Sequence, residues 1–178
     1  MELPRLALKL FVVNSASVRV KDFVPIFHSW IQKQCVEDHM LVDVHDYSHI
    51  HHGPGILLVA HEGNFSTDMA EGKFGLAYSR KQIAGKKLEE ELRTVLRYAQ
   101  QAASLIEAEP RLEGRLRFRK DELLIISNDR LLAPNDGAVF ETMKPALLGV
   151  FGKNAGLTHA GAGTKDRLTI RVTHPEGV

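Results

Sequence analysis

The sequence contains a single cysteine, Cys35, among its 178 residues. One cysteine cannot form a disulfide within the chain, so a small secreted domain held together by disulfides is excluded, and a reducing compartment is indicated. No apolar run approaches the roughly 18 residues needed to cross a bilayer. The first 14 residues carry Glu2, Pro4 and Lys9, which predicts a strand rather than a signal peptide. We therefore expect a cytoplasmic protein without a membrane segment.

The chain also lacks an excess of charge of either sign, since 23 Lys and Arg residues balance 22 Asp and Glu residues. This balance argues against a general nucleic-acid binder or a protein of anionic membrane surfaces, because both need a basic surface. No internal repeat and no low-complexity segment divides the sequence. Its length is that of one domain of about 100–200 residues, so we predict a single domain over 1–178.

Hydrophobic periodicity predicts the secondary structure. Five stretches are typical of strands, namely 6–13, 40–50, 56–62, 72–81 and 167–173, and 115–128 is typical of a hairpin that turns at Lys120-Asp121. Helical spacing predicts helices over 22–35, 88–109 and 136–151. Asp22 and Asp136 are the expected caps, and Pro145 is expected to bend or split the third helix.

These elements follow the order β-α-β-β-β-α-β-β-α-β, with a further short strand compatible with the sequence near Leu157. Runs of strands interrupted by single helices favour the α+β class. We predict a mostly antiparallel sheet with the helices packed on one face.

Histidines are concentrated in the hairpin predicted from the strands 40–50 and 56–62. Five of the nine fall within residues 43–62, at His45, His49, His51, His52 and His61. If residues 51–55 form the loop, Ile50 pairs with Ile56 and His45 lies opposite His61. Directly opposed side chains have Cβ atoms about 4.5–5.5 Å apart, which would let both imidazoles hold one ion or ligand. The opposite face is then predicted to meet the helices through Val42, Val44, Ile50, Ile56, Leu58 and Ala60.

The histidine-bearing face of the hairpin has two interpretations. The candidate binding residues are Asp43, His45, Tyr47, His49, His61 and Glu62, and the candidate metal ligands are His45, His49 and His61. Imidazole and carboxylate together suit a divalent transition metal such as Zn, Ni, Fe or Mn, and histidine also suits acid–base chemistry near neutral pH. A solvated, hydrogen-bonded strand surface explains the same residues and is the interpretation we favour.

Recognisable catalytic motifs are missing from the sequence. His61-Glu62 lacks a second histidine four residues after the first, because position 65 is Phe, so it is not the zinc-protease motif. There is no G-x-S-x-G elbow and no phosphate-binding loop. Cys35 lies near Glu37 and Asp38, and negative charge raises a thiol pKa, so we expect an inert thiol.

Residues 46–81, DYSHIHHGPGILLVAHEGNFSTDMAEGKFGLAYSRK, resemble a group of uncharacterised bacterial conserved hypothetical proteins, and the similarity covers most of the chain. The resemblance implies a bacterial, cytoplasmic protein and carries over no activity, ligand or catalytic residue.

Two functions from different classes follow from the sequence. The first is a non-catalytic binding or accessory module that uses the histidine-rich hairpin face for a small molecule or a protein partner. The second is a small metal-dependent enzyme, hydrolase-like, with the three histidines as ligands and Asp43 or Glu62 as general base.

Overall fold

The computed structural model describes residues 4–13, 18–51, 53–83, 87–161, 163 and 165–178. Within them lie the strands β1 (Leu6–Val12), β2 (Leu41–Tyr47), β3 (Gly55–Ala60), β4 (Gly63–Asp68), β5 (Gly75–Arg80), β6 (Phe118–Ser127), β7 (Gly156–His159) and β8 (Thr169–Thr173). The α-helices are α1 (Phe23–Lys33), α2 (Leu88–Glu107) and α3 (Gly137–Phe151), and the 3-10 turns are η2 (Val20–Asp22), η3 (Ala70–Gly72) and η4 (Pro110–Leu112). The strands form one antiparallel sheet in the order β2-β3-β4-β5-β1-β6-β8-β7.

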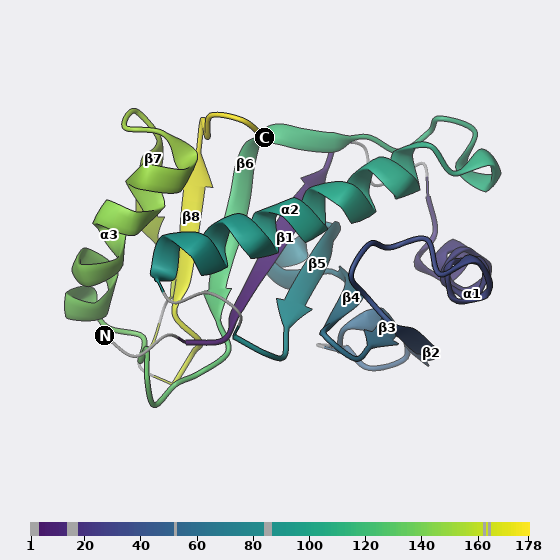
Figure 1. Ribbon diagram of the computed structural model, residues 1–178, viewed down its shortest axis with the longest axis horizontal. Coiled ribbons are helices and arrows are strands. Elements are labelled where there is room, and N and C mark those ends of the chain that lie inside the picture. The colour runs from purple at the N-terminus through teal and green to yellow at the C-terminus, as the bar shows by residue number, and fades with distance from the viewer. Residues whose placement is uncertain (1–3, 14–17, 52, 84–86, 162, 164) are drawn as a thin grey trace.

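The three α-helices pack on one face of this sheet, with α2 crossing its centre (Figure 1). The apolar stripe predicted for α2 is buried, and Leu92, Val95 and Ile106 are fully shielded from solvent. Each such side chain stabilises the fold by about 1.5–3 kcal/mol. The predicted α+β class, with a mostly antiparallel sheet and helices on one face, is confirmed. None of the described helices is long and apolar enough to span a membrane.

The centre of the sheet is buried on its other face as well. Every residue of β1 is buried, and β1 sends Leu6, Leu8 and Leu10 to the helices. Ala7 and Phe11 point the other way and form a second, smaller apolar cluster with residues of β6. Loops and long side chains shield this second cluster. We call this side of the sheet, which carries no α-helix, the helix-free face.

Two parts of the predicted element order are wrong. Strand β4 was not expected, because GNFSTD contains few β-branched or apolar residues; its register opposite β3 and β5 defines it. Residues 118–127 form one strand rather than a hairpin, so Lys120-Asp121 lies within β6 and not in a turn. Both residues are exposed on this strand, and two adjacent exposed charges resemble a turn signal in the sequence.

The predictions for the helix caps and for Pro145 were confirmed only in part. Asp136 caps α3 as predicted, since its carboxylate accepts a hydrogen bond from the amide of Val139 at 2.9 Å. Asp22 makes no such bond to α1 and accepts instead from the amide of Arg19 at 3.0 Å. Helix α3 continues through Pro145 as one element, so the predicted split does not occur. The small strand near Leu157 is present as β7.

The predicted register of the histidine-rich hairpin is also wrong. His45 lies opposite Leu57 instead of His61. Strand β2 ends at Tyr47, which makes the turn longer than expected, and a bulge at Val42 shifts the pairing again. Ile56, Leu58 and Ala60 face the core as predicted. Val42 and Ile50, at 56% and 48% exposure, do not.

Candidate binding site on the helix-free face

Asp43, His45 and Tyr47 lie side by side on β2, as predicted. The imidazole of His45 is 3.4 Å from the carboxylate of Asp43 and stacks on the ring of Tyr47, with centroids 5.9 Å apart. Asp43 also accepts a hydrogen bond from the amide of Val44 at 2.8 Å, which occupies a donor of this edge strand. The side chains of Asp43 and His45 are about half exposed, and charged side chains on an edge strand protect it from pairing with another chain.

The other candidate residues lie apart from this group. His61 follows β3 and is 3.3 Å from Glu62, whose carboxylate accepts from the amide of Met40 at 2.9 Å. Partial desolvation raises the pKa of Glu62, but these contacts lower it by more, so the pKa lies below its ordinary value. His49 is exposed in the turn after β2, and His52 lies outside the described residues. Among those that are described, no group of three or more His, Cys, Asp or Glu side chains could hold a metal ion, so the three proposed ligands are not brought together.

An open cavity of about 610 Å³ lies where the loops meet on the helix-free side. It is lined by His51, Gly53, Asp68, Met69, Ala70, Glu71, Gly72 and Arg167. These residues come from the turn between β2 and β3, the loop between β4 and β5, and the segment before β8. Its volume is within the range of about 300–1,000 Å³ found for sites that bind small molecules.

Lys9 holds the longest wall of this cavity, the loop 68–73. Its ammonium group is fully buried and donates to the carboxylate of Asp68, to the carbonyl of Ala70 at 2.9 Å and to that of Lys73 at 2.7 Å. Burial lowers the pKa of Lys9, and Asp68 opposes that shift. Position 75 requires glycine, because a Cβ there would clash with the backbone carbonyl oxygen of Leu10 and would lie 2.8 Å from Cε of Lys9.

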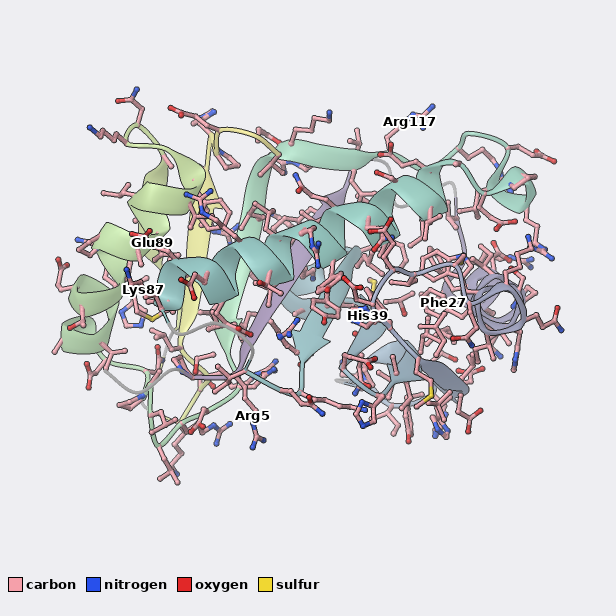
Figure 2. All side chains as sticks on the ribbon, viewed as in Figure 1. Arg5, Phe27, His39, Lys87, Glu89 and Arg117 are labelled. Atoms are coloured by element: carbon pink, nitrogen blue, oxygen red, sulfur yellow. The ribbon has the colours of Figure 1, made fainter. Side chains whose placement is uncertain are left out.

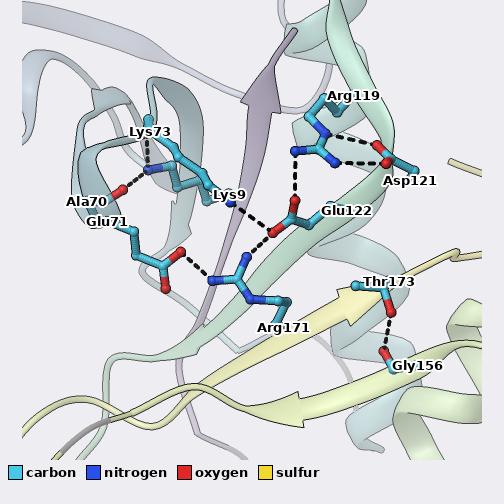
Figure 3. A network of polar contacts seen from close by, with 10 residues as sticks. All are labelled: Lys9, Ala70, Glu71, Lys73, Arg119, Asp121, Glu122, Gly156, Arg171 and Thr173. Atoms are coloured by element: carbon cyan, nitrogen blue, oxygen red, sulfur yellow. Dashed lines mark hydrogen bonds and ion pairs between the residues drawn. The ribbon is translucent and has the colours of Figure 1, made fainter.

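A chain of ion pairs fixes the same loop from the other side (Figure 3). Arg171 on β8 pairs with Glu71 in the loop and with Glu122 on β6. Glu122 is also bound by Arg119 at 2.8 Å. Arg119 in turn forms a two-bond pair with Asp121, which lowers the pKa of Asp121 to about 2. Glu71 has a left-handed backbone, with φ of 61°, and its pairing with Arg171 helps to hold that conformation.

Arg167, in the segment before β8, also lines the cavity. Its guanidinium donates to the side-chain oxygen of Asn128 at 2.8 Å. The amide nitrogen of Asn128 donates to the hydroxyl of Ser79 at 2.7 Å, so both ends of the Asn128 amide are engaged. Within the described part of the chain, no carboxylate lies within ion-pair distance of Arg167.

A second polar cluster is centred on His39, which is labelled in Figure 2 and whose ring packs against Tyr78 of β5 and Tyr98 of α2. His39 Nδ1 is 2.8 Å from the carbonyl of Glu37, and Nε2 is 2.8 Å from the hydroxyl of Tyr78. A carbonyl only accepts, so Nδ1 carries the proton and Tyr78 donates to Nε2. Burial lowers the pKa of His39 and raises that of Tyr78. Both rings are fully partnered, and the cluster joins β5 to Tyr98 of α2.

The residues that shape the cavity were missed at the level of sequence. Lys9 is a charge within an apolar strand, and such a charge signals a buried partner. That signal does not identify Asp68, which lies 59 positions away. Arg167 was predicted only as the first residue of the last strand, 167–173. Its position beside the 68–72 loop depends on the order of the sheet.

Comparison with known proteins finds no matching family model, no similar curated protein and no similar solved structure.

Proposed function

We propose that the protein is a non-catalytic binding or accessory module that holds a small polar molecule in the cavity of the helix-free face. The cavity itself carries the proposal. It is formed by three segments distant in sequence, and one of its walls, the loop 68–73, is fixed by the buried charge of Lys9 and the paired charge of Arg171. Such anchoring supports a surface that is formed before its ligand arrives.

The histidine-rich hairpin contributes to this site through its turn. His51 and Gly53 line the cavity, while Asp43, His45 and Tyr47 lie on the neighbouring strand. A metal-dependent enzyme would need three ligands around one ion, and the described residues offer no such group. We keep a cytoplasmic location as part of the proposal, on the strength of a single, partly buried cysteine.

Saturation-transfer NMR with a fixed panel of nucleosides, amino acids, sugars and small organic acids tests the proposal. The blocking variant is Ala70→Trp, because Ala70 is exposed and lines the cavity while its carbonyl still serves Lys9. Ala138→Trp, at an exposed position of α3, is the matched control. We expect at least one compound to bind the wild type and Ala138→Trp but not Ala70→Trp. Equal binding to all three proteins, or no binding of any compound, would refute the proposed site.

A further inference from the structure

The charges around the cavity are unequally compensated. Asp68 is neutralised by the buried Lys9, and Glu71 by Arg171, which also binds Glu122. Arg167 has only a neutral partner, the side-chain oxygen of Asn128. Both carboxylates that line the cavity therefore have a cation of their own, whereas the guanidinium of Arg167 has no described counter-charge.

Arg167 is also held in a defined orientation. The amide of Asn128 is fixed at its nitrogen by Ser79, and its backbone amide donates to the carbonyl of Arg5 at 2.8 Å. Its oxygen therefore points to Arg167 and occupies one of the five N–H donors of the guanidinium. The remaining donors form a planar fork that fits two oxygen atoms of a carboxylate or a phosphate.

We infer that the molecule bound in this cavity carries an oxyanion group, a carboxylate or a phosphate, which Arg167 binds. This inference rests on the proposed function and specifies its ligand class. The cavity of about 610 Å³ is far larger than one such group, so the rest of the molecule lies along the loop 68–72. There Met69, half exposed, offers an apolar contact.

Isothermal titration with citrate and with inorganic phosphate tests the inference and separates the two oxyanion types. The variant is Arg167→Gln, and the matched control is Arg130→Gln, which removes the same charge from an exposed position in the nearby loop. We expect one or both anions to bind the wild type, to bind Arg167→Gln at least about tenfold more weakly, and to bind Arg130→Gln within about twofold of the wild type. Increasing NaCl should weaken the binding.

Equal affinity of Arg167→Gln and wild type would overturn the role of Arg167. The panel of the preceding section distinguishes this failure from that of the proposed function. If uncharged compounds bind and Ala70→Trp abolishes their binding while neither anion binds, the cavity is a binding site and the oxyanion inference is wrong. If nothing binds, both are wrong.

Discussion

Lys9 is the residue on which the geometry of the cavity most depends. Its charge lies in the middle of the sheet, where an unpaired ammonium group would be strongly unfavourable. Three acceptors, all in the loop 68–73, satisfy its three N–H groups. The same bonds that make the buried charge tolerable therefore place the loop over the sheet.

Replacing Lys9 by Met should lower the free energy of unfolding by about 3–5 kcal/mol, because Asp68 loses its buried partner. Lys73→Met is the matched control, since Lys73 belongs to the same loop but is about half exposed and lies 3.5 Å from Glu122. We expect that change to cost no more than about 1 kcal/mol. Urea denaturation measures both, and equal losses would contradict the anchoring role of Lys9.

His39 should make stability depend on pH. Its pKa is lowered by burial, so the unfolded chain binds a proton more readily than the folded one. The contribution of neutral His39 to the free energy of unfolding is fully present above the ordinary histidine pKa of about 6.5. It decreases as the pH falls below that value. Urea denaturation between pH 8 and pH 5 should show this decrease in wild type and in His28→Gln, an exposed control on α1. His39→Gln should show a smaller one; an unchanged pH profile in that variant would exclude His39 as the cause.

For single residues, the sequence allowed the chemical character of a side chain's surroundings to be predicted, but not its partners. Cys35 was expected to be unreactive, and its thiol pKa is indeed raised, although burial is the main cause and not the acidic neighbours. The tautomer of His39 and the partner of Lys9 depend on contacts between distant segments. Local sequence does not contain those contacts.

Among the elements, α2 was predicted best, because its apolar residues repeat at helical spacing over many turns. Strand β8 was predicted for a similar reason, since Leu168, Ile170 and Val172 alternate inward and all are buried. The register of β2 and β3 could not be obtained in this way. Alternation fixes which residues share a face, but shifts by an even number of residues preserve it, and the bulge at Val42 has no clear sequence signal.

Leu92→Ala tests the packing of α2 on the sheet. Leu92 is fully buried, so its truncation should cost about 2–5 kcal/mol through lost burial and the cavity left behind. Leu131→Ala is the control, because Leu131 is 94% exposed and should change stability by less than about 0.5 kcal/mol. A loss below that limit for Leu92→Ala in denaturant unfolding would place its side chain outside the core.

For the whole molecule, the two faces of the sheet have different roles. One face binds the three α-helices and forms the main core. The other carries a small apolar cluster, a network of ion pairs and the open cavity. The fold class followed from the sequence, but the cavity did not, since its walls come from segments that only the sheet order brings together.

The central claim is that this cavity, and not the histidine face of β2, binds the ligand. Backbone amide shift mapping by ¹H–¹⁵N NMR, with the tightest-binding compound of the panel, tests it most directly. We expect the largest shifts at Gly53, in the loop 68–72 and at Arg167, with small changes at Asp43 and His45. Shifts concentrated at Asp43, His45 or His61, with the loop 68–72 and Arg167 unaffected, would contradict the claim.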